Sequence, residues 1–255
     1  MDLKLEGRRA LITGASSDLG RAIAAALADE GVDIALLGRD AGRLELGARR
    51  VRDAGRSATT VEADLGVPES MADAVSLARD ILGGPFTIFV HAAAHRFPMG
   101  KVRTLDPATA EEHLRIDVRG PLALLPPLIE DMMKERFGRI LWIGSTAGRL
   151  GAGKSPVYAG VKAFYSGLIR NLAVDHGTFG ITANLVEPSF VQTSRFEART
   201  DTATAGRWAA STALRRIAEP REVADVVTFL ASPRASYVTG AVIPVTGGAD
   251  LNTLW

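Results

Sequence analysis

Short apolar runs of strand-forming residues recur along the chain, and each is bounded by Gly, Asp or Pro. Between them lie stretches of helical period, such as residues 19–31, whose final Gly31 suits the end of a helix. A strand of a buried sheet and a helix packed on its face produce these two patterns. The runs predict seven strands, at 9–13, 33–37, 58–62, 86–90, 139–143, 181–186 and 241–245.

Strand and helix alternate over the whole length, which is typical of a parallel sheet covered by helices on both faces. We therefore predict an α/β fold, a doubly wound sheet of about seven parallel strands. No linker, composition shift or internal repeat divides the sequence, so residues 1–255 are expected to form a single domain. The helical stretch 107–137 contains Pro121, Pro126 and Pro127, which predicts a kink or a break.

Two long segments, about 91–106 and about 187–220, lack a clear period. Connections of this length in a compact α/β domain tend to be functional loops, and ligands of an open sheet bind at the carboxyl ends of its strands. Residues 189–212 have the polar, small-residue composition of a mobile lid. We expect residues 187–220 to form the substrate loop.

Composition and charge narrow the class of protein. Apolar residues make up 47% of the chain and charged residues 23%, an ordinary balance for a soluble protein. The formal net charge is only +1 and no long basic run occurs, so no nucleic-acid partner is expected. The absence of cysteine excludes disulfides, thiolate nucleophiles and cysteine-based zinc sites. Neither a signal-peptide pattern nor a membrane-spanning apolar run is present, so we expect a cytoplasmic protein with no membrane partner.

The stretch TGASSDLG, residues 13–20, directly follows the first predicted strand and opens the first helix. At such a turn, free backbone N–H groups and the positive helix end favour the phosphates of a dinucleotide. Asp18 stands where a middle glycine is expected, and its carboxylate would weaken phosphate binding unless it points away or caps the helix. The alternative is a plain glycine-containing turn with Asp18 as N-cap. The predicted cofactor contacts of this turn are Gly14, Ser16, Ser17, Asp18, Leu19 and Gly20.

The end of the second predicted strand indicates which dinucleotide is preferred. A carboxylate there suits the ribose 2′-hydroxyl of NAD(H), whereas an arginine suits the 2′-phosphate of NADP(H). Arg39 follows Gly38, which favours NADP(H) over NAD(H), although Asp40 is adjacent. After the third strand, Asp64 and Leu65 are placed to contact the adenine; alternatively, Asp64 is only a turn or helix-start residue.

Residues 148–162, GRLGAGKSPVYAGVK, support two incompatible interpretations. The spacing of a phosphate-binding P-loop is matched by Gly148, Gly153, Lys154 and Ser155. The residues STA (145–147) stand between that match and the end of the preceding strand, and Pro156 restricts the backbone before it, so a P-loop nucleotide hydrolase is disfavoured. In the other interpretation, Tyr158 and Lys162 lie four residues apart and share one face of a helix.

Ser145 supports the second interpretation, because it follows the strand 139–143 and precedes Tyr158 by thirteen positions. Together, Ser145, Tyr158 and Lys162 resemble the catalytic set of the short-chain dehydrogenase/reductase family. The resemblance covers essentially the whole chain, from the amino-terminal Thr-Gly motif to YVTGAVIPVTGG (237–248), which looks like the family's last strand. It implies a Rossmann-type fold and an NAD(P)-dependent oxidoreductase that interconverts a small secondary alcohol and a ketone.

The chemistry of these side chains agrees with that activity. Hydride transfer to a carbonyl builds negative charge on oxygen, so the site needs a proton donor and a second donor that polarises the oxygen. We assign Tyr158 as the general acid/base and Ser145 as the polarising donor, and we expect the ammonium of Lys162 to lower the pKa of the tyrosine. The resemblance adds that Lys162 binds the nicotinamide ribose. It also implies a proton relay through water and a backbone carbonyl at the position of Asp117.

Four motif positions depart from the family pattern: Asp18, the stretch His91 to Ala94, Asp117 and Ser189. They place the chain in a divergent branch and leave the Ser/Tyr/Lys set intact. Thr193 remains in place to meet the nicotinamide carboxamide. The resemblance also implies a homo-oligomer, a tetramer or a dimer. The further cofactor contacts that it implies are His91, Ala92, Ala93, Tyr158, Lys162, Pro188, Val191 and Thr193.

Three alternatives stay open. His91 and His95 have a spacing seen in metal sites, but no carboxylate or thiolate cluster joins them, so no metal is expected. The departures also fit a non-catalytic dinucleotide-binding protein of the same fold, against which the retained Ser/Tyr/Lys set argues. Loops expected to rim the site are basic, which raises the hypothesis of an acidic substrate or carrier protein. These basic residues are Arg96, Lys101, Arg103, Arg149, Lys154 and Arg195.

Overall fold

The computed structural model describes residues 2–95 and 99–251. Its seven strands form one parallel sheet in the order β3-β2-β1-β4-β5-β6-β7. All seven predicted strands are confirmed; the central strands β1, β4, β5 and β6 are almost fully buried, which explains their largely apolar sequences. They are β1 (Arg9–Thr13), β2 (Asp33–Gly38), β3 (Ala58–Glu62), β4 (Ile88–His91), β5 (Gly138–Ile143), β6 (Ile181–Pro188) and β7 (Val242–Val245).

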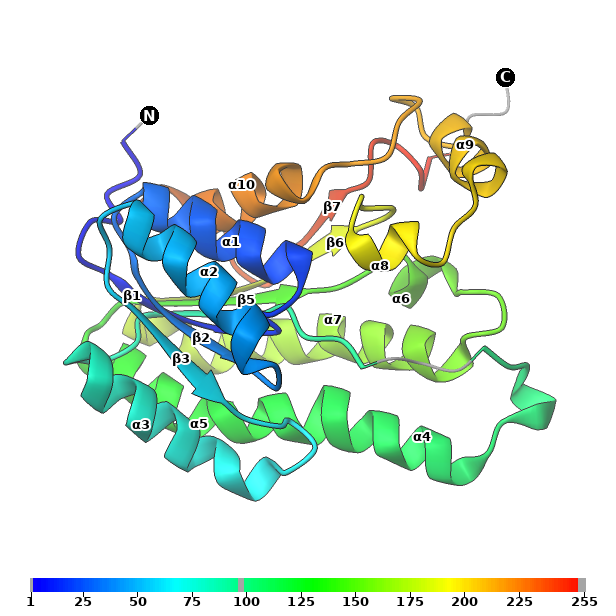
Figure 1. Cartoon of the computed structure of the whole chain (residues 1–255). Helices are drawn as coiled ribbons and strands as arrows, with labels where there is room; N and C mark the ends of the chain where they lie inside the picture. The colour runs from blue at the N-terminus through cyan, green and yellow to red at the C-terminus, as the bar shows by residue number, and fades with distance from the viewer. Residues whose placement is uncertain (1, 96–98, 252–255) are drawn as a thin grey trace.

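Helices connect successive strands and cover both faces of the sheet (Figure 1). The α-helices are α1 (Asp18–Asp29), α2 (Ala41–Asp53), α3 (Met71–Leu82), α4 (Pro107–Leu114), α5 (Gly120–Lys134), α6 (Ala147–Leu150), α7 (Pro156–His176), α8 (Ser194–Glu197), α9 (Thr202–Ala210) and α10 (Pro220–Ala231). Short 3₁₀ turns are η1 (Pro68–Ser70), η2 (Val102–Thr104), η4 (Gly177–Phe179) and η5 (Pro233–Ala235), and η3 (Arg115–Arg119) is a π-helical turn.

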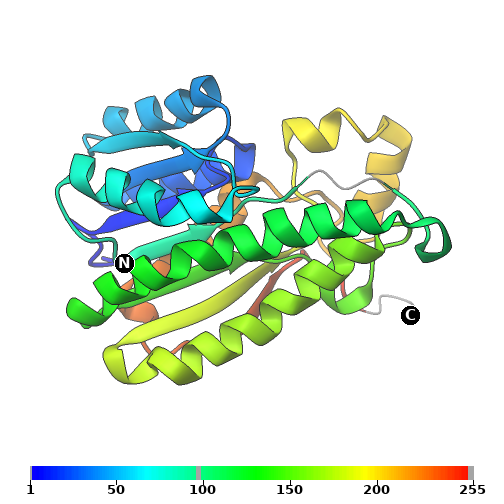
Figure 2. The same cartoon turned by 90° about the horizontal axis from the view of Figure 1, so that it is seen from below.

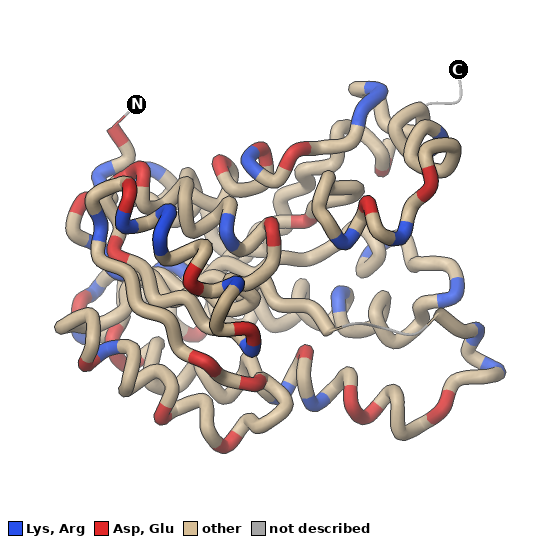
Figure 3. Tube along the Cα trace, viewed as in Figure 1, with Lys and Arg blue, Asp and Glu red and all other residues tan. Residues whose placement is uncertain are grey.

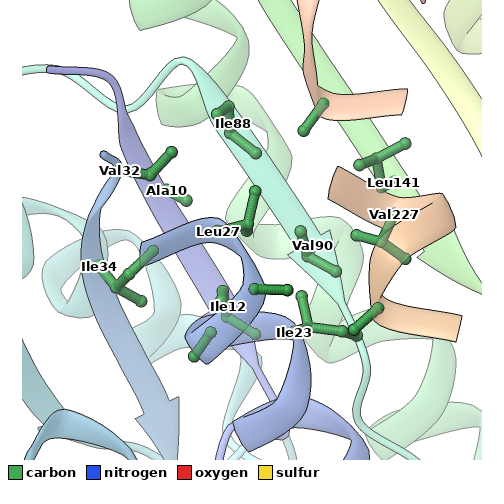
Figure 4. Close-up of a cluster of buried hydrophobic side chains, with 14 of the residues drawn as sticks. Ala10, Ile12, Ile23, Leu27, Val32, Ile34, Ile88, Val90, Leu141 and Val227 are labelled. Atoms are coloured by element: carbon green, nitrogen blue, oxygen red, sulfur yellow. The ribbon is translucent and has the colours of Figure 1, made fainter. Parts of the chain in front are cut away.

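Two apolar layers hold the sheet. On one face, α1, α2 and α10 pack over the strands, and on the other face α3, α5 and α7 do so (Figure 1). Figure 4 shows the first layer, in which Ile12 and Val90 of the sheet meet Ile23 and Leu27 of α1 and Val227 of α10. All five side chains are buried. The predicted doubly wound α/β class is therefore confirmed.

The helical stretch after β4 is interrupted, but not where its central prolines stand. Pro121 comes directly after the π-helical turn and has no N–H to donate to the carbonyl of Asp117 four residues earlier, whereas Pro126 and Pro127 lie inside α5 without ending it. The interruption is the π-helical turn 115–119, and Figure 2 shows α4 and α5 joined through it as one long helical segment. The predicted interruption is therefore found next to Pro121, and not at Pro126 or Pro127.

The described part of the 91–106 segment contains the short turn η2, whereas the 187–220 segment contains α8 and α9. In the described residues, none of the helices is both long enough and apolar enough to cross a membrane. Basic and acidic residues are interspersed along the trace, as Figure 3 shows, and many of their side chains pair, for example Arg50 and Arg221 with Asp29.

Candidate active site

Two glycines shape the turn between β1 and α1. Gly14 has a φ of +68°, and a Cβ atom there would stand 2.5 Å from the backbone nitrogen of Ala93. A Cβ atom on Gly20 would stand 2.3 Å from the carbonyl oxygen of Gly14. The turn therefore lies directly against the segment after β4, and α1 lies directly against the turn. The Ser17 hydroxyl caps α1 by accepting from Gly20 N–H and donating to the Gly14 carbonyl.

Asp18 is the first residue of α1 and not its N-cap, so the capping alternative was wrong. Its carboxylate is paired with Arg21, lies 4.0 Å from Arg43, and accepts hydrogen bonds from the backbone and hydroxyl of Ser194. Burial raises its pKa, but the bonds from Ser194 and the two arginines outweigh this and hold the pKa below its usual range. The negative charge near the turn is thus neutralised by its own neighbours, which removes the obstacle expected for phosphate binding.

A cavity of about 570 Å³ opens at the carboxyl ends of the strands, above the start of α1. The first N–H groups of α1 have no acceptor within the helix, and their residues Asp18 and Leu19 line this cavity. The tight glycine cradle, the helix start and the neighbouring arginines fit the pyrophosphate of a dinucleotide. Of the predicted cofactor contacts, those that line it are Gly14, Ser16, Ser17, Asp18, Leu19, Arg39, Asp64, Leu65, Ala92, Ala93 and Thr193.

Six predicted cofactor contacts are not among the described residues that line this cavity. Gly20 acts through packing, as described above. Val191 forms a β-bridge with Ala218, and Pro188 ends β6. The remaining three are His91, Tyr158 and Lys162, which are described below. Asp64 fits both of its interpretations, because it lines the cavity and also accepts a hydrogen bond from the turn residue Gly66.

His91 faces the core. It is fully buried, its Nδ1 lies 2.8 Å from the hydroxyl of Thr13, and its ring packs against Trp142 and Tyr165. Burial, followed by the nearby charge of Lys162, holds its pKa well below the usual range, so the ring is neutral. The His91 side chain is therefore packed in the core and is not among the described residues that line the large cavity. The residue instead ties the end of β4 to the end of β1.

The three predicted catalytic side chains lie together. Ser145 follows β5, and Tyr158 and Lys162 lie one turn apart on α7. A hydrogen bond joins the side chains of Ser145 and Tyr158. The Lys162 Nζ lies 5.7 Å from the centre of the Tyr158 ring and donates a 2.9 Å hydrogen bond to the Ile143 carbonyl. The loop after β5 and the face of α7 thus form one polar cluster.

The protonation of this cluster differs from the expectation. Burial raises the pKa of Tyr158, and the bond to Ser145 and the charge of Arg195 offset this only in part. Burial also lowers the pKa of Lys162 to about 8, against the attraction of the Asp117 carboxylate. The net shift of the Tyr158 pKa is upward, so the prediction that it lies below its usual value was wrong for this arrangement. Tyr158 is a protonated donor at neutral pH.

Gly148 contributes by packing, not by binding phosphate. It lies in α6, and a Cβ atom there would stand 2.7 Å from the backbone carbon of Lys162. Helix α6 can therefore lie directly on α7, which fixes the loop of Ser145 against the face that carries Tyr158. The helix α7 begins at Pro156, after the lysine and serine of the matched pattern. These 148–155 residues accordingly do not form a strand-loop-helix phosphate cradle.

Asp117 lies in the π-helical turn and is 4% exposed. Its backbone carbonyl, the predicted relay group, accepts a 2.8 Å hydrogen bond from the hydroxyl of Tyr165. One lone pair of that oxygen is therefore in use. The carboxylate accepts from the backbone N–H of His95 and lies 3.2 Å from Nδ1 of His113.

A second cavity, of about 190 Å³, adjoins Tyr158. It lies between the start of α7 and the segment that leads into α4. Sequence reasoning did not predict it, because it depends on where the long segment after β4 folds back. The residues that line it are Met99, Gly100, Thr104, Leu105, Asp106, Thr109, His113, Ser155, Pro156, Val157 and Tyr158.

The positive charge around the site is smaller than the sequence indicates. Arg149 lies in α6 and binds Glu187 and Asp250, so its charge is already paired. Arg195 lines the large cavity, whereas Arg96 lies outside the described residues. Within residues 2–95 and 99–251, no group of three or more potential metal ligands is arranged to hold an ion.

Sequence reasoning missed several residues of the large cavity, above all Arg43, Ser194 and His95. The signal for Arg43 was present, because it follows Arg39 by four residues at the start of a helix. Asp40 caps that helix by accepting from the backbone N–H of Arg43. Ser194 could not have been found locally, since its partner Asp18 stands 176 positions away.

Known proteins resemble this chain over nearly its full length. Residues 14–250 match the family described as enoyl-(acyl carrier protein) reductase. The chain is 31% identical to 3-oxoacyl-[acyl-carrier-protein] reductase FabG of Vibrio cholerae, over 96% of this chain and 98% of that protein. It is 32% identical to cis-4-hydroxycyclohexanecarboxylate dehydrogenase of Sinomonas cyclohexanicum, over 94% of this chain and 96% of that protein.

Solved structures agree with the sequence relatives. A protein described as a short chain dehydrogenase/reductase family protein superposes with a TM-score of 0.85 at 36% identity, covering 97% of this chain and 98% of that one. A short-chain dehydrogenase/reductase of Serratia marcescens superposes with a TM-score of 0.87 at 31% identity, covering 96% and 98%. This chain therefore belongs to the short-chain dehydrogenase/reductase family and is an NAD(P)-dependent oxidoreductase.

Proposed function

We propose that this protein is an NADP(H)-dependent oxidoreductase that interconverts a secondary alcohol and a ketone. The observation that carries the proposal is the hydrogen-bonded pair of Ser145 and Tyr158, with Lys162 beside it on α7. The names of two relatives, a 3-oxoacyl reductase and a hydroxycyclohexanecarboxylate dehydrogenase, point to the same interconversion. A bound nicotinamide would supply or accept the hydride.

The side chains have distinct roles in the proposed reaction. The raised pKa keeps the phenol of Tyr158 protonated, which suits proton donation to a developing alkoxide during reduction. The hydroxyl of Ser145 would donate to the same oxygen, and such preorganised donors are worth several kcal/mol in a transition state. Lys162 stays mostly cationic at pH 7 and would stabilise the phenolate that Tyr158 leaves behind.

The preference for NADP(H) is supported by two arginines. Arg39 and Arg43 both line the large cavity at the end of β2. Asp40, the acidic residue between them, accepts a 2.9 Å hydrogen bond at the start of α2 and does not line that cavity. The 2′-phosphate would therefore meet two guanidinium groups, while the ribose hydroxyl of NAD(H) would lack the usual carboxylate.

Fluorescence titration with NADPH and NADH tests the preference. We expect Arg39→Ala and Arg43→Ala to weaken NADPH binding by about tenfold each, because a hydrogen bond to a charged group contributes roughly 1.5–3 kcal/mol. NADH binding should change little, as should both affinities in the control Arg49→Ala, which loses only an exposed pair with Glu45. Equal binding of NADH and NADPH by the wild type would refute the preference.

The proposed function also involves a substrate loop, an oligomeric state and a cellular location. Residues 187–220 would form a substrate loop within one catalytic domain, since Thr193, Ser194 and Arg195 line the cavity and Ser194 binds Asp18. We further propose a homo-oligomer, a dimer or a tetramer, that works in the cytoplasm on a small-molecule substrate. Light scattering coupled to size-exclusion chromatography would measure its mass.

A further inference from the structure

A buried histidine and aspartate lie between the two cavities. His113 of α4 is 1% exposed and Asp117 of the π-helical turn is 4% exposed. The imidazole Nδ1 lies 3.2 Å from one carboxylate oxygen, and the other oxygen accepts the backbone N–H of His95. Because a carboxylate only accepts, the proton of the imidazole is held on Nδ1. Asp117 thereby fixes which nitrogen of His113 is left for another partner.

That nitrogen has no partner within the described part of the chain. The Nε2 atom of His113 is buried without a hydrogen bond, and so is Nδ1 of His95, whose ring packs edge-on against His113 at 4.8 Å. A buried polar atom left unsatisfied costs about 1–3 kcal/mol. If His113 only filled space, an apolar ring would fill it equally well without leaving a polar atom unsatisfied. An oriented imidazole with an unsatisfied nitrogen instead indicates a ligand.

The place for the ligand is the 190 Å³ cavity, which both His113 and Tyr158 line. A substrate whose carbonyl meets Tyr158 would therefore extend a neighbouring group toward His113. The cavity wall also carries hydroxyls, from Thr104, Thr109 and Ser155. The rest of the wall is mainly apolar, from residues such as Met99, Leu105 and Val157, so the cavity suits an apolar substrate body that carries a polar group.

We propose that His113 is a specificity-determining residue that binds a hydroxyl group of the substrate, so that the preferred substrates are hydroxyketones and the corresponding diols. A neutral imidazole accepts a hydrogen bond at Nε2 and an imidazolium donates one, and a hydroxyl group can serve as the partner of either form. This inference rests on the proposed function, since it concerns the substrate that Tyr158 would reduce.

The test compares NADPH-dependent reduction of cyclohexanone with that of 2-, 3- and 4-hydroxycyclohexanone. For the wild type we expect kcat/KM to be about tenfold higher for at least one hydroxyketone, the effect of one hydrogen bond of roughly 1.4 kcal/mol. In His113→Phe this ratio should fall to about one, chiefly through KM. His113→Gln keeps a hydrogen-bonding group and should retain part of this ratio. The control His176→Phe, at the far end of α7, should retain the whole ratio.

Several results would overturn the inference. It fails if the wild type reduces cyclohexanone as well as every hydroxyketone, or if the preference survives in His113→Phe. It also fails if His113→Gln and His113→Phe lose cyclohexanone and hydroxyketone reduction equally, because that pattern belongs to a structural residue. A wild type that binds no dinucleotide and reduces none of these ketones would instead show that the proposed function itself is wrong.

Discussion

Replacement of Lys162 by methionine should stabilise the protein while removing its proposed activity. The ammonium of Lys162 is 5% exposed and is held by one hydrogen bond, to the carbonyl of Ile143. The charge of the Asp117 carboxylate raises the pKa of Lys162, but it does not fully offset the lowering caused by loss of hydration. Methionine has a similar length and no charge to bury, so Lys162→Met fits the same space.

The magnitude follows from the shift of the lysine's pKa from 10.5 to about 8. Each unit is worth about 1.4 kcal/mol, so burying the charged form costs roughly 3 kcal/mol at pH 7. Lys162→Met also loses the hydrogen bond to Ile143, which lowers the free energy of unfolding by about 1 kcal/mol. The net increase in the free energy of unfolding is therefore about 2 kcal/mol. Between pH 8 and 10.5 the unfolded chain binds more protons than the folded one, so wild-type stability rises with pH there and the gain shrinks.

Urea denaturation at pH 7 and pH 9.5 measures both effects. The difference between wild type and Lys162→Met cancels the titration of distant groups. Lys134→Met, at the exposed end of α5, serves as the control and should change the free energy of unfolding by less than about 0.5 kcal/mol. A variant less stable than the wild type at pH 7, or a difference that does not change with pH, would refute this reasoning.

Two further predictions concern the support of the site. Gly148→Ala should destabilise the fold by about 1–3 kcal/mol and lower kcat, because its Cβ would overlap the backbone at Lys162 and push α6 off α7. Gly153→Ala has open space and should leave urea denaturation and turnover unchanged; equal behaviour of the two variants would contradict the packing role. Arg149→Ala should cost about 1–3 kcal/mol in the free energy of unfolding, because it leaves the buried Glu187 carboxylate without its cation. Unchanged urea denaturation would show that Glu187 needs no partner.

The sheet could be predicted from the sequence because its strands are buried on both faces. In the run 139–143 every residue after Arg139 is apolar, and the structure buries all of β5. Ser145, Tyr158 and Lys162 could be assigned because one strand end and one helix turn bring them together within a short stretch.

The rest of the site depends on tertiary contacts that local patterns do not contain. From the sequence alone, the Asp18 carboxylate is expected to weaken phosphate binding. In the fold, Ser194, Arg21 and Arg43 surround it and offset its charge. His113 and Asp117 are neighbours through their i,i+4 spacing, but their burial between the two cavities depends on how the segment after β4 folds back. The sequence also does not show which prolines interrupt the helix: Pro126 and Pro127 are accommodated inside α5, whereas the π-helical turn lies directly before Pro121.

The most direct test of the proposed function is single-turnover reduction of a ketone that the wild type accepts, measured with NADPH for wild type and Tyr158→Phe. NADPH titration of the variant establishes that it is folded. We predict that the wild type turns over and that Tyr158→Phe loses about 10²–10⁴-fold in rate, the usual contribution of a positioned acid. A rate within tenfold of the wild type would show that Tyr158 is not the proton donor. A wild type that binds NADPH tightly and turns over no ketone or alcohol would identify a non-catalytic dinucleotide-binding protein instead.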